Sequence, residues 1–385
     1  HKPKIVISDY DLGRRCGLDL LQKNREKNST SKETLFFLIT ANASQTAVAQ
    51  AAEEDVDAFL LKPFTVEGLK NSIHRAVNLK LHPSEYIKTI EVGKTVLVSG
   101  KIDEAIQAFN RAVNLSEKPS LAHFYLARAN LNKKSLTSAQ NHFFEGLRHN
   151  QLHYKCLVGL YDVLIAKHRH EEAYQVVKRI AKYFPANPER VSAIFRLAVL
   201  TQNFEDIENY YKIFTSIDDR SEDMIRHVSS ALVVAGKYFL RKSDIETATR
   251  HFQYAVTTAP RRPTVLREII MSLIERGLVD DARAFFKKTP QDSRYQTNSL
   301  AMEYVIRNQL DSTSQIIDSG RDLIAKGFHD PAIYNILIRR SIEAGLIPSA
   351  EDLIYKASQL WPQQSETFAE LMEVPNDSQT ETPTL

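Results

Sequence analysis

A pattern of side-chain sizes repeats along most of this chain and limits how it can fold. A small residue is followed four positions later by a large one and three positions after that by a second small one, as in Ala105, Phe109 and Ala112. Successive copies are 34 residues apart from Ala105 to Ile207. Because small residues let two helices cross closely and a large one fills the gap beside them, the pattern predicts stacked pairs of antiparallel helices. Further copies begin at Ala139, Ala173, Ala248, Ala282 and Ala350.

Composition agrees with a largely helical fold and argues against several classes of protein. The 385 residues include only 12 glycines and 14 prolines, so residues that break helices are sparse. A formal net charge of +3 gives no support for binding to nucleic acid or membranes. No stretch approaches the roughly 18 apolar residues of a membrane span. The two cysteines, Cys16 and Cys156, suggest a reducing compartment, and we expect a cytoplasmic protein of more than one domain.

Residues 1–80 follow a different pattern, in which short apolar strands alternate with helices. This alternation predicts a parallel sheet with helices as the connections. Each expected helix carries an apolar stripe that would cover the sheet. The expected elements are strand Lys4–Ser8, a helix near Gly17–Lys27, strand Thr34–Thr40, a helix near Ser44–Glu54, strand Ala58–Leu61 and helix Val66–Leu79.

Three polar residues, Asp9, Thr40 and Lys62, fall at the ends of the three expected strands. The carboxyl ends of parallel strands meet at one edge of a sheet, so these side chains should converge. A carboxylate can attack a phosphoryl group, a hydroxyl can donate to its oxygens, and a lysine can balance its charge. Taken singly, each also suits an ordinary role: a turn or helix cap for Asp9, a cap or strand-end hydroxyl for Thr40, and a solvated charge for Lys62.

The same residues resemble the second half of the receiver domain of bacterial two-component response regulators. The resemblance rests on Asp9 with Gly17 eight residues later, on residues 39–41 (Ile-Thr-Ala) and on residues 59–64 (Phe-Leu-Leu-Lys-Pro-Phe). It implies a CheY-like, flavodoxin-type fold, of which the third to fifth strands are present.

The resemblance also implies roles for individual residues. Asp9 would be the phosphoacceptor for a histidine kinase, Thr40 the switch hydroxyl and Lys62 the lysine that contacts the phosphate. Phe59, otherwise an ordinary core residue, would take the place of the aromatic side chain that moves between exposed and buried positions. A homodimer formed through the last helix and strand of the receiver is typical of the family.

Receiver domains of this kind use Mg²⁺, which Asp9 and the backbone carbonyl of Asp11 would bind together with an acidic pair. The acidic pair is missing from this chain, in which only eight residues precede Asp9. Mg²⁺ prefers octahedral coordination by several oxygens, so one carboxylate and one carbonyl make a poor site. We therefore expect Mg²⁺ only in a complete receiver, no cofactor in this chain, inefficient phosphorylation and an uncovered apolar face of the sheet.

The repeats in residues 85–364 resemble the tetratricopeptide repeat (TPR) family, whose period is also 34 residues. About seven or eight units are expected, with degenerate ones near 188–228 and 291–330. A linker at 81–84 would separate this all-α superhelix from the α/β receiver segment. Residues 365–385 would hold the end of the final helix and a disordered tail.

The concave face of such an array is its usual binding surface. Four basic residues expected on it, Lys94, Arg128, Lys237 and Arg339, would suit an acidic or carboxylate-ended peptide. They are equally compatible with scattered cations on a mixed surface. The register places the ninth residue of each first helix on this face: Lys94, Arg128, Asp162, Lys237, Met271 and Arg339.

The order of the two segments predicts a response regulator of a phosphorelay whose output is protein binding. Phosphorylation of Asp9 by a histidine kinase would change how the repeats bind a protein or peptide, with a homodimer compatible with the receiver segment. The alternative is a constitutive TPR scaffold or adaptor with a vestigial receiver. No Gly-rich phosphate loop, zinc pattern or Ser-His-Asp arrangement can be assigned, so we do not expect an enzyme.

Overall fold

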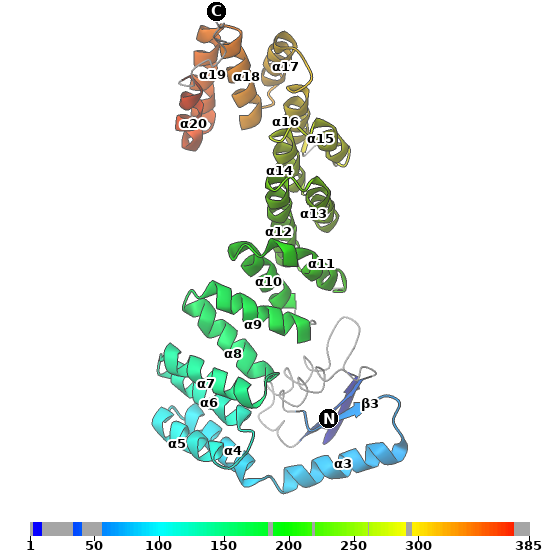
Figure 1. Cartoon of the computed structure of the whole chain (residues 1–385), viewed down its shortest axis with the longest axis vertical. Coiled ribbons are helices and arrows are strands. Elements are labelled where there is room, and N and C mark those ends of the chain that lie inside the picture. The colour runs from blue at the N-terminus through cyan, green and yellow to red at the C-terminus, as the bar shows by residue number, and fades with distance from the viewer. Residues whose placement is uncertain are drawn as a thin grey trace, which may run out of the picture. The chain divides into compact units, whose positions relative to one another are not determined.

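The computed structural model of the chain describes residues 3–9, 34–40, 56–183, 188–217, 220–260, 262–289 and 295–372. The helices expected near Gly17–Lys27 and Ser44–Glu54, the backbone of Asp11 and the tail from residue 373 lie outside these residues. The chain forms two compact units, His1–His227 and Val228–Leu385, which are described separately below. Figure 1 labels the helices and strands of both.

The first unit begins with a parallel sheet of three strands in the order β1-β2-β3. The strands are β1 (Ile5–Asp9), β2 (Leu35–Thr40) and β3 (Ala58–Leu61), followed by helix α3 (Val66–Leu81). These bounds agree within two residues with the expected strands and with the last expected helix of this segment. The parallel α/β arrangement predicted from the alternating pattern is confirmed for the described residues.

The central strand β2 has an apolar core on each of its two faces because successive side chains of a strand point to opposite sides. On one face, Phe36 and Leu38 are buried against Val6, Val56 and Phe59. On the other face, Leu35 and Phe37 are buried against α3. The side chains of α3 that cover this second face are Leu69, Ile73, Ala76 and Val77.

Strand β1 is less well covered than β2. Ile5 and Ile7 pair in register with Leu35 and Phe37, so they lie on the face that α3 covers further along the sheet. Their exposed fractions are nevertheless 40% and 46%. The expected uncovered apolar surface is therefore present at these two residues.

Lys80, near the end of α3, attaches this helix to the start of the sheet. Its Nζ donates to the carbonyl oxygen of Thr34 at 3.0 Å and pairs with Asp57 Oδ1 at 3.0 Å. Asp57 Oδ2 in turn accepts a hydrogen bond from the backbone N–H of Phe36 at 2.7 Å. The pair is partly buried, so it contributes more than a fully exposed pair would.

Three residues, His82–Ser84, separate α3 from α4, where a linker at 81–84 is expected. From α4 to α19 the described chain forms eight consecutive helix pairs. The stretches near 188–228 and 291–330, which depart from the repeat pattern, also form helices. The helices of the first unit are α4 (Glu85–Val98), α5 (Ile102–Val113), α6 (Ser120–Asn132), α7 (Leu136–His149), α8 (Tyr154–Ala166), α9 (His170–Tyr183), α10 (Pro188–Leu200), α11 (Ile207–Thr215) and the start of α12 (Glu222–Arg241), with the short 3₁₀ helix η2 (Phe204–Asp206).

The second unit contains the rest of α12 and the remaining pairs. A half-buried arginine, Arg267, joins α14 to the start of α18: its two terminal nitrogens donate to Asp330 Oδ1 at 2.6 Å and Oδ2 at 2.5 Å. Its helices are α13 (Ile245–Thr258), α14 (Pro263–Ile274), α15 (Val279–Phe286), α16 (Gln296–Arg307), α17 (Thr313–Ala325), α18 (Pro331–Glu343), α19 (Ile347–Leu360) and α20 (Ser365–Ala369), with 3₁₀ helices η4 (Pro362–Gln364) and η5 (Glu370–Met372).

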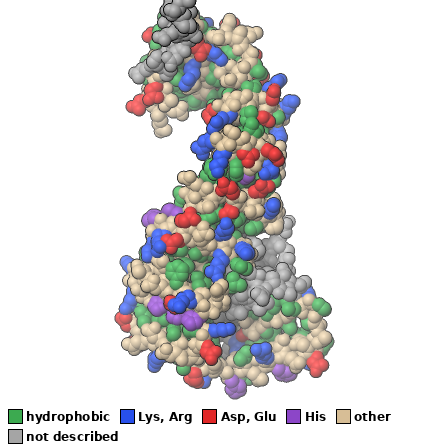
Figure 2. Space-filling model, in the orientation of Figure 1, with side chains coloured by type: hydrophobic (Ala, Val, Ile, Leu, Met, Phe, Trp, Pro, Cys, Tyr) green, Lys and Arg blue, Asp and Glu red, His purple; other side chains and the backbone are tan. Residues whose placement is uncertain are grey.

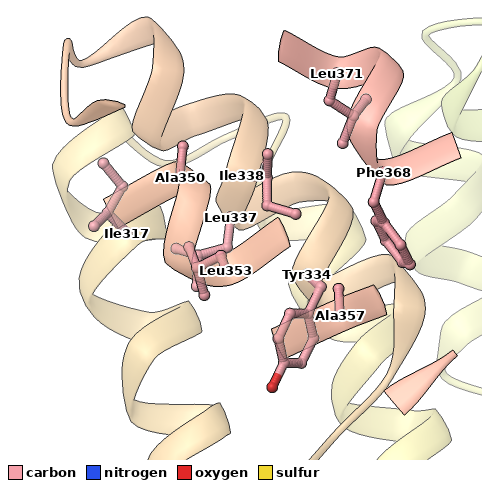
Figure 3. Close-up of a cluster of buried hydrophobic side chains, with 9 residues drawn as sticks. All are labelled: Ile317, Tyr334, Leu337, Ile338, Ala350, Leu353, Ala357, Phe368 and Leu371. Atoms are coloured by element: carbon pink, nitrogen blue, oxygen red, sulfur yellow. The ribbon is translucent and has the colours of Figure 1, made fainter. Parts of the chain in front are cut away.

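The C-terminal core of the second unit is made by α17 to η5 (Figure 3). Tyr334 of α18, Ala357 of α19 and Phe368 of α20 are all at most 2% exposed in this cluster. Phe368 and Leu371 come from the short helices that follow the last pair. Residues 365–372 therefore cover the end of the apolar core.

The backbone repeats with the same period as the sequence. In the turn between the two helices of a pair, one residue has positive φ, and in the first unit these residues are exactly one period of 34 apart by number: Gly100, Lys134, His168 and Gln202. Only the first is a glycine, so the turn imposes this strained conformation on ordinary residues too. The second unit continues the series with Ser243, Gly277 and Gly345.

Within the pairs, aromatic rings pack directly on glycine backbone. The rings of Phe109 and Phe252 occupy the space that a Cβ of Gly93 and Gly236 would need, in each case between the two helices of one pair. Phe143 instead packs on Gly159, in the first helix of the next pair. The large-and-small pattern of the sequence thus acts both within pairs and between them.

Within the described residues, no helix is both long enough and apolar enough to cross a membrane.

Two buried histidines lie in the first unit near the contact of α6, α7 and α8. The ring of His123 stacks with those of His142 and His149, with centroids 5.7 Å apart in both cases. His153 is 4% exposed, and its Nδ1 accepts the backbone N–H of Cys156 at the start of α8. Burial lowers the pKa of His123 to about 4, assisted by His142 and His149. Burial, assisted by Lys155, likewise lowers the pKa of His153 to about 4.

Replacing Gly159 by alanine tests the ring-on-glycine packing. The new Cβ would overlap the ring of Phe143, so we expect a loss of about 1–3 kcal/mol in unfolding free energy. This opposes the gain of about 1 kcal/mol that Gly→Ala brings in an open helix position. Thermal unfolding measures the difference. Adding Phe143→Leu should recover part of the loss, and an additive or larger loss in the double variant would contradict the contact.

The histidines predict that acid destabilises the first unit. A lowered folded-state pKa means that the unfolded chain binds more protons, so this stability is present above about pH 6.5 and falls as the pH approaches 4. Each group should cost about 1–2 kcal/mol at about pH 5. His153→Asn keeps a capping oxygen without a titrating ring. Its melting temperature should fall less than that of the natural chain between about pH 7.5 and pH 5; an equal fall would exclude His153 as a cause.

Candidate functional site

The carboxyl edge of the sheet brings together two of the three polar residues expected there. Asp9 is the last residue of β1, and Lys62 directly follows β3. The Nζ of Lys62 lies 2.5 Å from Asp9 Oδ2, although β2 lies between their strands. Thr40 is the last residue of β2, and its side chain, like the whole of Asp11, lies outside the described residues.

Strand register explains why these residues meet. Asp9 pairs with Ile39 and Thr40 pairs with Leu61, so the three strands end within about one residue of one another. Pro63 follows Lys62 through a cis peptide bond. The edge therefore presents a carboxylate and an ammonium group on either side of the end of β2.

The ion pair at this edge is open to solvent, with side-chain exposed fractions of 45% for Lys62 and 38% for Asp9. Exposed pairs of this kind contribute only about 0–1 kcal/mol to stability. The lysine can therefore exchange the carboxylate for another anionic oxygen at small cost.

Phe59 lies in β3 and is half-buried against Phe36 and Leu38 on the face of the sheet opposite α3. It occupies the inward position of the two that the receiver resemblance implies. The ordinary role as a core residue accounts for this contact equally well.

The residues described at this edge do not by themselves fit Mg²⁺. Asp9 supplies one carboxylate, which already pairs with Lys62. In the described part of the chain, no group of three histidine, cysteine, aspartate or glutamate side chains could bind a metal ion. Since Mg²⁺ takes several oxygen ligands, we derive no step of chemistry through it.

The second candidate site is formed by the first helices of successive pairs. These helices lie side by side: α4, α6 and α8 in the first unit, and α14, α16 and α18 in the second. We call the residues at the ninth repeat position of these helices the position-nine row. On the face drawn in Figure 2, basic and acidic side chains are interspersed over the surface.

Two of the four basic residues expected in the position-nine row are already paired. Lys94 pairs with Glu91 at 2.6 Å and lies 5.6 Å from the centre of the Tyr125 ring. Lys237 pairs with Glu268 of α14 at 2.9 Å. The expected row of open cations is therefore altered, because neighbouring glutamates offset these two lysines.

The two arginines of the row are more accessible. Arg339 is exposed, and its Nε donates to Asn335 Oδ1 at 3.0 Å. Arg128 is exposed on α6, and in the described structure it has neither a hydrogen bond nor an ion pair. Asp162 is exposed and Met271 half-buried at the same repeat position.

The fourth helix pair adds a residue that the sequence analysis missed. Arg196 on α10 is 34 residues after Asp162 and is exposed. Its repeat lacks the small residues of the pattern, which hid the register. Counting the period onward from Asp162 would have found it.

A pocket of about 350 Å³ in the second unit was also missed. Residues of α12 and α14 line it, among them Lys237 and Met271 of the position-nine row. It also includes Arg241 and Arg276, which lie at the ends of their helices and outside the pattern used to find the row.

Comparison with known proteins supports both segments. A family profile described as "Tetratricopeptide repeat" matches residues 93–148. A probable chemotaxis protein CheY of Rhizobium etli is 35% identical over 69 residues, which are 18% of this chain and 53% of that protein. Chemotaxis protein CheY1 of Helicobacter pylori is 33% identical over 70 residues, again 18% of this chain and 56% of that protein. The chain thus spans about half the length of these curated relatives.

Solved structures with TPR-type helices are also similar. A tetratricopeptide repeat protein from Parabacteroides merdae is 14% identical with a TM-score of 0.34, covering 66% of this chain and 97% of that one. A structure titled Naa15/Naa10 bound to HypK-THB is 16% identical with a TM-score of 0.43, covering 85% of this chain and 51% of that one. The periodic sequence, the helix pairs and the matches to receivers together identify this chain as a CheY-like receiver segment joined to tetratricopeptide repeats.

Proposed function

We propose that this chain belongs to a response regulator in which Asp9 accepts a phosphoryl group and the repeats bind a protein partner. The observation that supports this most is the Asp9–Lys62 pair at the carboxyl edge of a parallel sheet, 2.5 Å apart. Neither residue is used to hold the fold together, since both side chains are largely open to solvent.

In the proposed reaction, a carboxylate oxygen of Asp9 attacks the phosphorus of a phosphohistidine on the kinase. A P–O bond to Asp9 forms, the P–N bond of the donor breaks, and the imidazole leaves. The acyl phosphate adds a charge of about −1.5 to −2 at the edge. Lys62 would then pair with the phosphoryl oxygens, and Thr40 would donate to them as the receiver resemblance implies.

The proposed signal runs from the sheet edge to the repeats through α3. This helix packs on β2 and β3, and only His82–Ser84 separate it from α4. A coupling free energy of about 1–3 kcal/mol would be enough to change partner affinity several-fold. No catalytic role toward other molecules is part of the proposal.

The proposal also covers surroundings and assembly. A cytoplasmic location would give access to a histidine kinase. A homodimer could use the surface of α3, where Val66, Leu79 and Leu81 are 72%, 60% and 67% exposed. A constitutive TPR scaffold stays as the second candidate, because the described residues offer Mg²⁺ only one carboxylate at this edge.

Labelling with a small acyl phosphate donor and Mg²⁺ tests the phosphoacceptor. We expect slow, substoichiometric labelling of the natural chain that is labile to hydroxylamine, and none in Asp9→Asn. The reason is that only a carboxylate can form the acyl phosphate, while its metal site is incomplete in the described residues. Intact-mass spectrometry gives the yield, and peptide mapping gives the site.

Asp103→Asn is the matched control, since Asp103 is an exposed aspartate on α5 paired with a lysine. It should label like the natural chain. Labelling that persists in Asp9→Asn would contradict the proposed acceptor. Absence of labelling in all three proteins would favour the constitutive scaffold.

Lys62→Ala separates chemistry from stability at the same edge. Because the ion pair is exposed, its removal should change the unfolding free energy by less than about 1 kcal/mol. Labelling of Asp9 should nevertheless slow at least tenfold, since the lysine no longer offsets the charge of the incoming phosphoryl group. Rates from the same mass assay, beside thermal unfolding, measure both; an unchanged rate would remove Lys62 from the site.

A further inference from the structure

The pocket between α12 and α14 has an uneven use of charge. Four of its ten lining side chains are basic and two are acidic. Two of the basic groups are engaged: Arg267 binds both carboxylate oxygens of Asp330, and Lys237 pairs with Glu268 at 2.9 Å. Because Asp330 is 8% exposed, its pair with Arg267 is structural.

The other two basic groups, Arg241 and Arg276, have no such use. Both are exposed, and neither makes a hydrogen bond or ion pair within the residues that the structure describes. Arg241 is the last residue of α12, and Arg276 lies two residues beyond α14. Their position at helix C-termini is electrostatically favourable. Their guanidinium groups nevertheless donate to no carbonyl there, so all their donors are available.

The rest of the pocket limits the kind of ligand. Leu240 and Met271 contribute apolar surface, and methionine adapts readily to different shapes. Glu275 is exposed beside Arg276 and offsets part of its charge. A polyanion such as a nucleic-acid backbone would therefore meet repulsion as well as attraction. One or two carboxylates next to an apolar side chain match this combination better.

We propose that the α12–α14 pocket binds an extended segment of a partner protein that carries a carboxylate side chain beside an aliphatic one. Arg241 and Arg276 donate charge-assisted hydrogen bonds to the carboxylate. Met271 and Leu240 contact the aliphatic group. This rests on the proposed function, in which the repeats bind a protein, and it specifies the chemistry of that protein and the helix pair that contacts it.

Fluorescence anisotropy with two labelled octapeptides tests the pocket on the full chain. One peptide alternates glutamate and leucine, and the other alternates glutamine and leucine. We expect the glutamate peptide to bind at least tenfold more tightly, because only it supplies carboxylates. Arg241→Glu with Arg276→Glu should reduce its affinity at least tenfold, whereas Arg241→Lys with Arg276→Lys should retain most of it.

Arg128→Glu is the matched control, since Arg128 is also exposed and unpaired in the described structure but lies on α6 in the first unit. Its affinity should stay within twofold of the natural chain. An equal loss in Arg128→Glu would show general charge attraction and overturn the proposal. No effect of the double charge reversal, or no preference for glutamate, would overturn it too.

Circular dichroism melts of each variant show that it is folded. Should the double charge reversal unfold the second unit, Arg241→Gln with Arg276→Gln removes the charges without adding new ones, and the same tenfold loss is expected. Phosphoryl labelling of Asp9 does not involve these residues. Failure of the peptide test would therefore leave the proposed phosphoacceptor standing, and failure of labelling would leave the pocket standing.

Discussion

The close packing of an aromatic ring on a glycine backbone is the contact on which the repeat array depends. Phe109 on Gly93 and Phe252 on Gly236 join the two helices of a pair, and Phe143 on Gly159 joins one pair to the next. Each contact removes a large apolar surface from water and brings two helix backbones unusually close. Since a single added methyl group would overlap the ring, the geometry of neighbouring helices tolerates little change. Rigid first helices are the result, and they carry the surface available to partners.

That surface is shaped by which charges the fold already uses. Lys94 and Lys237 are offset by glutamates, whereas Arg128, Arg241 and Arg276 are open in the described structure. The glutamates do not abolish binding, because exposed pairs are weak and exchange easily. They do reduce long-range attraction, so recognition depends on local combinations of charge and apolar contact. The pocket of α12 and α14 is such a combination.

The sheet edge follows the same principle of weak, exchangeable pairing. Asp9 and Lys62 are close but exposed, so neither is committed to holding the fold. By contrast, the Lys80–Asp57 pair is partly buried and tied to backbone groups, and it holds α3 against the sheet. The first pair is suited to chemistry and the second to structure. Between them, α3 connects a site that can change charge to the helices that would respond.

The sequence by itself determined the parallel strands, the helix pairs and the 34-residue period, because alternation and side-chain size are local patterns that backbone geometry must follow. It also predicted that Asp9 and Lys62 would share an edge, since parallel strands end together. Only the tertiary structure decided which cations stay open. Glu268 reaches Lys237 across two helices, and Arg241 meets Arg276 around one pocket, although neither pairing follows the repeat register. Side-chain contacts between elements depend on crossing geometry, which a periodic pattern does not encode.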